Sequence, residues 1–327
     1  MANIKVSACI ITYNHEKYIK ECLDGALNQK LDYEYEINVF EDFSTDKTRE
    51  IVLDYAKRYP NKIKIFLNEK NLGLVGNWVH ALTSCDGDYI AICEGDDYWT
   101  DPNKLQKQVH FLENHPGFAI SSHNANIIMD GKTVKLYCGL NHPAIMDLDH
   151  LLTYGSSGPT CSLVIRKKTI ENFPDWFNKM RACDWSVQII AAQNGKIKYS
   201  PEIMSTYRRH NQGALFSQIK EVKSKGTSDF GLPSKYTLGM IEAVDKYFKY
   251  KYSKQLNIQK TYWYDLYIRE YFKINDYANA KKYYLKILKQ TIHSKYWKYP
   301  LVSYKRLIKL SILFLPDFLI KSIIKNV

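Results

Sequence analysis

The chain has 327 residues, a formal net charge of +12 and seven cysteines. This length allows a full catalytic domain and a smaller second unit. The cysteines include no Cys-x-x-Cys pair, and several lie inside apolar runs, so we expect buried free thiols in a reducing compartment. The pattern excludes a disulfide framework and a zinc site built from cysteine pairs.

The positive charge is concentrated in the last third of the chain. Residues 1–234 hold 27 Lys and Arg against 28 Asp and Glu, whereas residues 235–327 hold 19 against 6. We therefore predict a nearly neutral domain at 1–217, with halves at 1–100 and 101–217, and a connector at 218–234. The basic region at 235–327 is expected to face an anionic partner.

The first hundred residues alternate between strands and helices. Apolar runs without polar alternation predict buried strands, and apolar positions at helical spacing predict the helices between them. Short connections join these elements, which is typical of a doubly wound sheet. The expected strands are at residues 6–11, 36–40, 62–67 and 89–93, and the expected helices are at 16–29, 49–59 and 75–84.

The rest of the chain is first mixed and then helical. We expect helices at 103–114, 185–194, 236–252, 259–272 and 277–291, and strands at 119–122 and 161–165. Residues 307–324 are apolar, but charged residues and Pro316 interrupt them, which argues against a membrane-spanning helix. We expect residues 303–327 to lie on a membrane surface or, alternatively, to pack on the protein itself.

Three acids follow the strand expected at 89–93, in the stretch Glu94-Gly95-Asp96-Asp97. Carboxylates at this density repel one another and need a cation or close hydrogen-bond donors. Oxygen ligands at the carboxyl end of a strand suit Mg²⁺ or Mn²⁺ holding a diphosphate, and ligands bind at this end of α/β sheets. The alternative interpretation is a solvated acidic turn.

The acidic stretch is one of six polar stretches in a distinctive order. They are Thr12-Tyr13-Asn14, Glu41-Asp42 before Ser44-Thr45-Asp46, Asn71-Leu72-Gly73, Glu94-Gly95-Asp96-Asp97, Ala182-Cys183-Asp184-Trp185 and Tyr207-Arg208-Arg209-His210. In order and spacing they resemble the family 2 glycosyltransferases over roughly residues 4–215. The resemblance implies the GT-A fold, a Rossmann-like α/β architecture with a mixed or parallel sheet and flanking helices, here followed by a C-terminal helical region.

The resemblance also implies a donor site for a nucleotide-sugar, with a UDP-sugar favoured over a dTDP-sugar. Asp42 would accept the uracil N3–H, although by itself it is also a plausible N-cap of the next helix. The same pocket would be lined by Thr12, Tyr13, Asn14 and Asn71.

The acids that follow would hold the ribose, the diphosphate and the metal ion. Asp96 would contact ribose and phosphate. Asp97 would be the main ligand of Mn²⁺ or Mg²⁺, with Asp96 and His210 beside it. Glu94 takes the first place of the family's Asp-x-Asp triplet, a departure that keeps the charge.

The second half would supply the base and the cations for the leaving group. An inverting transfer needs a base for the acceptor hydroxyl, and Asp184 matches the family's position, with Cys183 where an acid usually precedes it. The alternative is that Asp184 caps the helix beginning at Trp185. Arg208 and His210 would neutralise the leaving UDP, or else are surface cations on a loop. No Gln-x-x-Arg-Trp motif follows, which favours transfer of one sugar per encounter.

The expected enzyme therefore moves one sugar to an acceptor hydroxyl on a lipid-linked oligosaccharide or other bacterial surface glycan, by family-level analogy. The chain begins directly with a strand, so we expect no signal peptide and a cytoplasmic location at the inner face of the plasma membrane, on anionic lipid. A homodimer is left open.

Three other functions fit the sequence less well. A nucleotidyltransferase would need a glycine-rich phosphate-binding loop after the first strand, and residues 12–16 do not have that sequence. A nucleic-acid-binding protein fits the basic tail but lacks a recognisable motif, so we expect no nucleic acid. An inactive scaffold is disfavoured because both Asp97 and Asp184 are present.

Overall fold

The computed structural model describes residues 6–129, 131–180, 182–210, 232–273 and 276–293. The chain divides into two compact units, one of residues 1–151 with 155–213 and one of residues 152–154 with 214–327. The expected connector at 218–234 lies largely outside the described residues, and the expected membrane-surface segment at 303–327 lies wholly outside them. None of the helices in the described part combines the length and the apolar character that a membrane crossing requires.

In the described residues of the first unit, ten strands form one mixed sheet in the order β3-β2-β1-β4-β9-β6-β10-β5, with β7 beside β6 and β8 beside β10. The strands β1 to β4 are mutually parallel where they pair, whereas β9 runs antiparallel to both β4 and β6. The strands are β1 (Val6–Thr12), β2 (Tyr35–Glu41), β3 (Ile63–Leu67), β4 (Tyr89–Glu94), β5 (Tyr98–Trp99), β6 (Phe118–Met129), β7 (Lys132–Leu136), β8 (Ile145–Met146), β9 (Val164–Arg166) and β10 (Lys196–Arg209).

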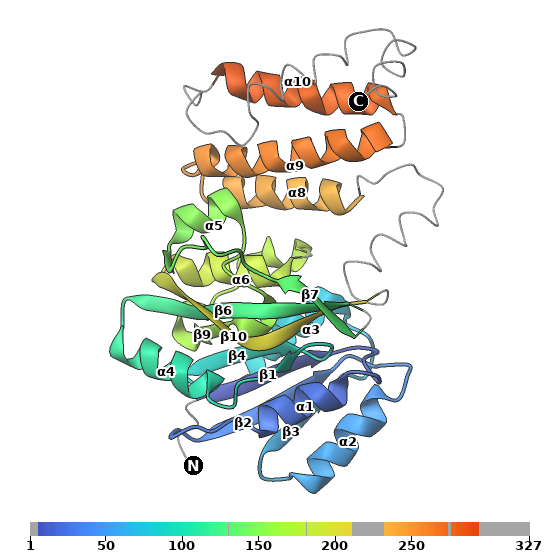
Figure 1. Ribbon diagram of the computed structural model, residues 1–327, viewed down its shortest axis with the longest axis vertical. Helices are drawn as coiled ribbons and strands as arrows, with labels where there is room; N and C mark the ends of the chain where they lie inside the picture. The colour runs from blue at the N-terminus through green and yellow to red at the C-terminus, as the bar shows by residue number, and fades with distance from the viewer. Residues whose placement is uncertain (1–5, 130, 181, 211–231, 274–275, 294–327) are drawn as a thin grey trace. The chain divides into compact units, whose positions relative to one another are not determined.

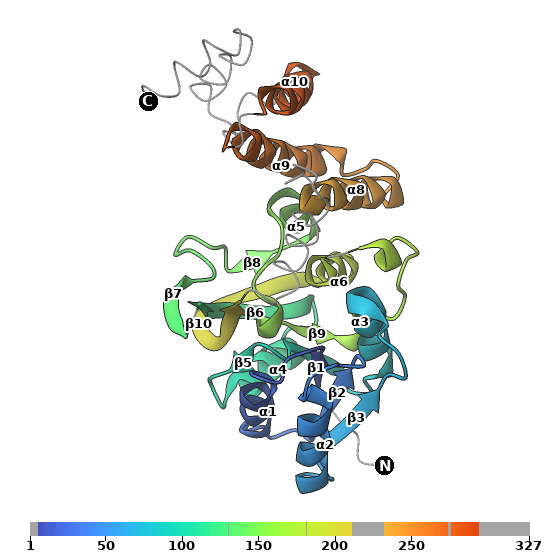
Figure 2. The same cartoon turned by 90° about the vertical axis from the view of Figure 1, so that its right-hand side faces the viewer.

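Helices cover both faces of this sheet (Figures 1 and 2). Alternate residues of a strand point to opposite faces. Val39 therefore packs in the cluster with α1, α2 and α4, while Phe40 stacks on Phe66 and meets His80 of α3. The helices of this unit are α1 (Ile19–Leu27), α2 (Thr48–Arg58), α3 (Gly73–Ser84), α4 (Lys104–Asn114), α6 (Cys183–Ala192) and the first part of α5 (Leu148–Tyr154). The expected mixed sheet with flanking helices is confirmed.

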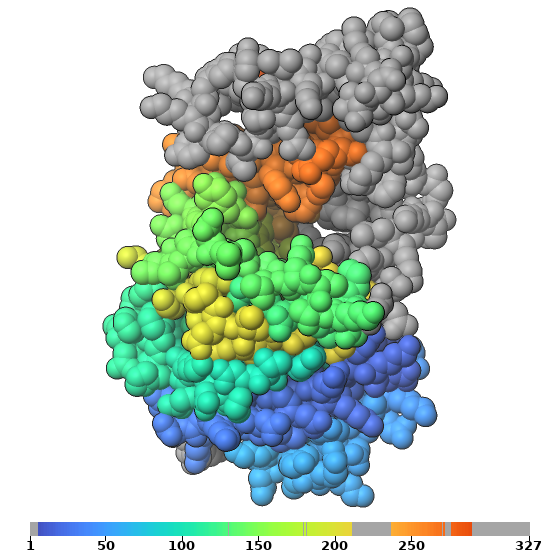
Figure 3. Space-filling model, in the orientation of Figure 1, coloured from blue at the N-terminus to red at the C-terminus, as the bar shows by residue number. Residues whose placement is uncertain are grey.

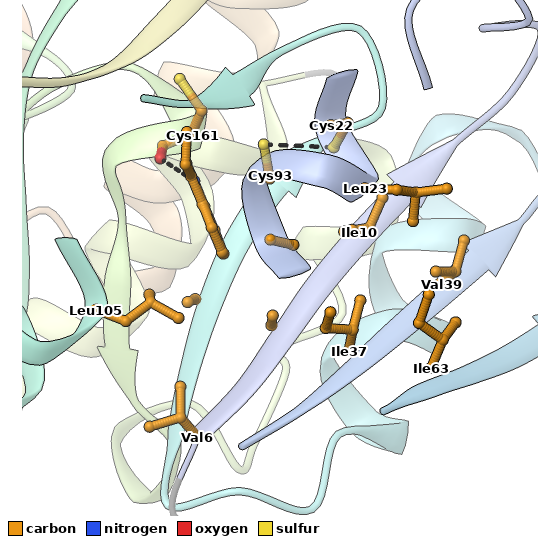
Figure 4. Packing of buried hydrophobic residues seen from close by; sticks show 14 of the residues in the cluster. Val6, Ile10, Cys22, Leu23, Ile37, Val39, Ile63, Cys93, Leu105 and Cys161 are labelled. Atoms are coloured by element: carbon orange, nitrogen blue, oxygen red, sulfur yellow. Dashed lines mark hydrogen bonds between the residues drawn. The ribbon is translucent and has the colours of Figure 1, made fainter. Parts of the chain in front are cut away.

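The core between β1, β2, β4 and helices α1, α2 and α4 is built mainly from aliphatic side chains and cysteines, together with Tyr55, Tyr89 and Trp99 (Figure 4). Cys22 of α1 and Cys93 of β4 point toward each other there, with 3.7 Å between their sulfur atoms. All seven cysteines are buried free thiols. In the space-filling view, the segments from β1 to β10 form one continuous surface (Figure 3).

Two of the expected elements differ from the structure. The strand expected at 161–165 is wrong in its first half, because residues Thr160–Ser162 form a 3-10 turn and β9 begins only at Val164. The Ser162 hydroxyl donates to the Pro159 carbonyl at 2.7 Å, which favours the turn over an extended chain. The strand expected at 119–122 is much longer, since β6 continues to Met129.

The second unit contains the expected C-terminal helices, α8 (Leu232–Tyr247), α9 (Ser253–Lys273) and α10 (Tyr277–His293). The first of them ends five residues earlier than expected, because Lys249 and Tyr250 take left-handed conformations with φ of 49° and 63°. Helices α9 and α10 pack through a tyrosine-rich core. The members of this core are Tyr264, Tyr267, Ile268, Tyr271, Tyr277, Ala280, Tyr284 and Ile287.

Candidate active site

The candidate site lies where the order of the parallel strands reverses. From β1 the chain builds β2 and β3 on one side and then returns to place β4 on the other side. Such a reversal leaves a crevice outside the carboxyl ends of the two central strands, where α/β proteins bind ligands. Thr12 ends β1 and Glu94 ends β4, so the loops after both strands border this crevice.

Gly95 lets the loop after β4 pack closely against the loop after β1. Its N–H donates to the Ile11 carbonyl at 2.9 Å. A Cβ at this position would lie 2.6 Å from the Thr12 hydroxyl oxygen and 2.8 Å from Nδ1 of His15. Both contacts are shorter than van der Waals distance, so a glycine is required here if the acidic loop is to keep its position.

Asp97 is a buried carboxylate with one unused oxygen. Its side chain is 1% exposed, and Oδ1 accepts a 2.7 Å hydrogen bond from the N–H of Arg208. Among the described residues, Oδ2 has no hydrogen-bond partner. Burial raises the pKa of Asp97 well above its usual value, and the charges of Asp96 and Glu94 add to the rise. A buried carboxylate in this state is stabilised by a cation.

Asp96 has histidine partners instead. Its Oδ2 lies 2.9 Å from Nε2 of His210 and 3.9 Å from Nε2 of His15. Burial raises the pKa of Asp96, but the two histidines outweigh this effect and hold the pKa below its usual value. Nδ1 of His210 is buried without a partner in the described part of the chain. The loop after β4 and the end of β10 are thus joined through Asp96.

Arg208 is held at the same place by contacts within the chain. Its Nε donates to the Asp96 carbonyl at 2.8 Å, and Nη2 pairs with Glu21 of α1 at 2.6 Å. The guanidinium also lies 4.5 Å from the ring centre of Tyr18. To bind a phosphate by two hydrogen bonds, the guanidinium would have to leave Glu21.

Asp42 sits at the end of β2 and binds the N-terminus of α3. Its Oδ1 accepts from the Leu72 N–H at 2.7 Å and its Oδ2 from the Gly73 N–H at 3.0 Å. Asn68 donates a further 2.8 Å hydrogen bond to Oδ1. The alternative that Asp42 caps the next helix, α2, is therefore wrong, because the carboxylate faces the helix after it. Burial raises the pKa of Asp42, while these donors oppose the rise.

The other predicted donor-site residues lie in the loops after β1 and β3 or at the end of β1. Asn71 donates to the Asp42 carbonyl at 3.1 Å. The side chain of Asn14 joins the first two loops, since its Oδ1 accepts from the Thr45 N–H at 2.8 Å. Thr12 is buried, with its hydroxyl 3.2 Å from Nδ1 of His15, whereas Tyr13 is 41% exposed.

Asp184 lies in the first turn of α6, which begins at Cys183. The alternative that Asp184 is the N-cap is wrong, because Ala182 holds that position. Burial raises the pKa of Asp184, and the backbone N–H groups of Trp185 and of Asp184 itself partly offset the rise. Burial also raises the pKa of Glu94 to about 8, with contributions from the charges of Asp96 and Asp184.

Several neighbours of these groups were not predicted. His15 follows directly on the Thr12-Tyr13-Asn14 stretch, yet only the fold brings it to Asp96. Tyr207 precedes Arg208, and the charges of Asp97, Glu94 and Asp184 all act on its hydroxyl. Its ring meets that of Tyr137 edge to face, with 5.2 Å between the centres. No sequence signal pointed to Tyr137, because it follows β7 in the least recognisable part of the chain.

No three His, Cys, Asp or Glu side chains converge into a ready cation cage within the described residues. This finding is compatible with Mg²⁺ or Mn²⁺, because such an ion is usually held by one or two carboxylates and completed by substrate phosphates and water. The unpaired Asp97 Oδ2 and His210 Nδ1 supply oxygen and nitrogen donors of the right kind. The residues present therefore fit a divalent ion that arrives with a diphosphate.

Comparison with known proteins settles the family. The glycosyl transferase family 2 model matches residues 7–172, which is half of the chain. The chain belongs to this family. An uncharacterised protein of Mycobacterium tuberculosis is 36% identical over 213 residues, which cover 65% of this chain and 61% of that protein. The match thus spans less than two thirds of this relative.

Solved structures show the same fold. The structure resembles that of Staphylococcus aureus TarS 1-349 in complex with UDP-GlcNAc, with a TM-score of 0.55 and 18% sequence identity. The match covers 92% of this chain and 95% of the TarS chain. The structure also matches the mannosyltransferase PcManGT of Pyrobaculum calidifontis, in complex with GDP-Man and Mn²⁺, with a TM-score of 0.54, 14% identity and coverage of 97% and 83%. The GT-A fold expected from the sequence is confirmed.

Proposed function

We propose that the chain is a metal-dependent, inverting, non-processive glycosyltransferase that moves one sugar from a UDP-sugar to an acceptor hydroxyl. The observation that carries the proposal is the buried Asp97 carboxylate, whose Oδ2 has no partner among the described residues, at the carboxyl end of the sheet. TarS was solved with UDP-GlcNAc and PcManGT with GDP-Man and Mn²⁺, which supports a nucleotide-sugar donor and a divalent ion.

The donor occupies the crevice between the loops after β1, β2 and β4. Thr12, Tyr13, Asn14, Asp42 and Asn71 line its nucleoside part. Asp42 has its carboxylate fixed by the α3 N-terminus, so its orientation is set before the ligand arrives. Fixing a polar group in this way lowers the cost of binding.

The diphosphate lies toward the acidic loop. Asp97, with Asp96 and His210 beside it, holds Mn²⁺ or Mg²⁺ there, and the bound ion supplies Lewis-acid stabilisation of the negative charge on the leaving UDP. Arg208 adds a cation at the same position. Because Asp96 is already paired with His210, we assign Asp97 as the main ligand of the ion.

Asp184 acts as the base. Its carboxylate accepts the proton of the acceptor hydroxyl while the hydroxyl oxygen bonds to the anomeric carbon and the bond to the diphosphate oxygen breaks. Burial raises the pKa of Asp184 and makes it a stronger base. Burial raises the pKa of Glu94 to about 8 in the ion-free site, which favours a protonated carboxyl that can donate a hydrogen bond to a sugar hydroxyl.

We further propose a lipid-linked or other glycan acceptor and attachment to anionic membrane, with no role for nucleic acid. The lysines of α10, Lys281, Lys282, Lys286 and Lys289, support an anionic partner for the second unit. Cosedimentation with phosphatidylglycerol vesicles tests this attachment. Removal of residues 303–327 should abolish it, and unchanged binding would contradict the proposed membrane segment. Light scattering would decide whether the chain is a homodimer.

The function itself is tested by incubating the protein with UDP-, dTDP- and GDP-sugars and following release of the nucleoside diphosphate, with Mn²⁺, with Mg²⁺ and with EDTA. We expect slow metal-dependent hydrolysis of one UDP-sugar even without acceptor, because water can replace the acceptor hydroxyl. Release that is equal with and without metal would contradict metal dependence. No release from any donor, with or without a panel of glycan acceptors, would contradict the transferase.

A further inference from the structure

Phe43 has a backbone conformation that does not suit its side chain. Its φ is +59°, in the left-handed region, where a bulky residue other than glycine is uncommon. Its side chain is also 45% exposed, so burial in the core does not compensate for the strain. Strained residues of this kind concentrate at ligand sites, where the surrounding structure holds them in place.

The contacts around Phe43 impose this conformation. On one side, the Asp42 N–H donates to the Thr12 carbonyl at 3.0 Å, which extends the pairing of β1 and β2. On the other side, the Ser44 N–H donates to Oε1 of Glu41 at 2.6 Å. The Ser44 hydroxyl in turn accepts from the Asn14 N–H at 3.0 Å. The backbone is therefore pinned both before and after Phe43.

A cation supports the ring of Phe43. The guanidinium of Arg49 lies 5.1 Å from the ring centre. Arg49 itself is fixed, since Nε pairs with the Glu41 carboxylate and Nη2 donates to the Asn68 carbonyl at 2.8 Å. Arg49 thus supports the ring of Phe43, which follows Asp42 in the chain, while the residue remains 45% exposed.

A second exposed aromatic follows the neighbouring strand. Tyr13 comes directly after Thr12, the last residue of β1, and Phe43 comes two residues after Glu41, which pairs with Thr12. An aromatic ring that is rigid, exposed and next to a carboxylate suits the flat face of a nucleobase whose edge the carboxylate binds.

We propose that Phe43 is a nucleobase-stacking residue of the donor site, one that contributes affinity for the base of the nucleotide and none for its phosphates. The inference rests on the proposed nucleotide-sugar function. The alternative is that the ring only shields Arg49 and stabilises the loop.

The test is calorimetric titration of the full chain with uridine, UDP and, separately, inorganic pyrophosphate in the presence of Mn²⁺. Phe43→Ala should weaken uridine and UDP by about tenfold, because base stacking on an aromatic side chain has this order of magnitude. Pyrophosphate binding should not change. Phe43→Tyr and Phe43→Trp should keep affinity within about threefold of the wild type.

Two further variants separate stacking from support of the loop. Phe43→Gly removes both ring and strain, so it should lose as much UDP affinity as Phe43→Ala while melting at a higher temperature than Phe43→Ala. Tyr59→Ala is the matched control, because Tyr59 is a similarly exposed aromatic beneath Arg58, at the end of α2, and should leave UDP affinity unchanged.

Unchanged UDP affinity in Phe43→Ala and Phe43→Gly would overturn the proposal while leaving the transferase intact. A parallel loss of pyrophosphate and uridine binding would also overturn it, in favour of loop support. If the wild type bound neither UDP, dTDP nor GDP, the proposed function would fail first, and the role of Phe43 with it.

Discussion

The backbone N–H of Arg208 donates a 2.7 Å hydrogen bond to Oδ1 of Asp97, which joins two residues 111 positions apart. The other carboxylate oxygen of Asp97 is left buried and unpaired among the described residues. One oxygen is thus fixed by the protein, and the other is available for a ligand. This division of roles leads to the first prediction.

Asp97→Asn should lower metal-dependent turnover by about 100-fold or more, because it removes the proposed main metal ligand. The amide oxygen can still accept from Arg208, and one buried negative charge is lost, so the melting temperature should stay the same or rise. Turnover and thermal unfolding are measured on the same preparation. An active Asp97→Asn enzyme would remove the metal assignment, and an unfolded one would show that the carboxylate is structural.

Asp184→Asn should lose transfer by a factor of about 100 to 10,000, the usual contribution of a general base, and should keep UDP-sugar binding. Its position in the first turn of α6 is compatible with an amide, so the fold should survive. Initial rates and donor affinity are compared with those of the wild type. Loss of donor binding instead of transfer would place the base elsewhere.

Gly95→Ala should impair donor binding through the acidic loop. Its Cβ would lie 2.6 Å from the Thr12 hydroxyl, so Asp96 and Asp97 must shift relative to β1. We expect a loss of UDP affinity of about tenfold or more, since small misplacements at a site are costly. Gly117→Ala is the control, because a Cβ at Gly117 meets nothing within 4 Å. Equal behaviour of the two variants would argue against the close packing of the loops.

Lys104 makes the stability of the protein depend on pH. It is fully buried, with Nζ 4.3 Å from the Trp99 ring centre and unpaired among the described residues. Burial lowers the pKa of Lys104 to about 7 in the folded state, against 10.5 as the usual value. Between pH 7 and pH 10.5 the unfolded chain binds one proton more than the folded protein does at Lys104. The contribution of Lys104 to the free energy of unfolding therefore rises with pH.

The rise due to Lys104 should be about 2 to 3 kcal/mol between pH 7 and 9. Lys104→Met should remove this slope and should be more stable than the wild type at pH 7. Urea unfolding at pH 7 and pH 9 measures the difference in free energy of unfolding between wild type and variant. The contributions of the other titrating groups cancel in this difference. Lys107→Met serves as the control, because Lys107 is exposed and paired with Asp101. A difference between Lys104→Met and wild type that does not change with pH would contradict the prediction.

Much of the first unit could be predicted from the sequence, because its strands and helices are local patterns. The apolar run before Glu94 is a strand, as expected, since fully buried parallel strands carry no polar alternation. The strand expected at 161–165 failed because an apolar run cannot be told from a 3-10 turn by periodicity alone.

The candidate site was less predictable, because it depends on contacts between distant segments. The acids after β2 and β4 could be located by their order along the chain. The contacts of His15 and His210 with Asp96 could not, since they require the loop after β4 to pack against the loop after β1 and against the end of β10. Nor could the left-handed backbone of Phe43, which three hydrogen bonds around the loop impose.

The most direct test of the account is calorimetric titration of the purified protein with UDP, first with Mn²⁺ and then with EDTA, in wild type and in Asp97→Asn. We expect UDP to bind the wild type with Mn²⁺, and to bind much more weakly both with EDTA and in the variant. Binding that is unchanged by EDTA and by Asp97→Asn would contradict the metal site, and no binding of UDP, dTDP or GDP under any condition would contradict the nucleotide-sugar site itself.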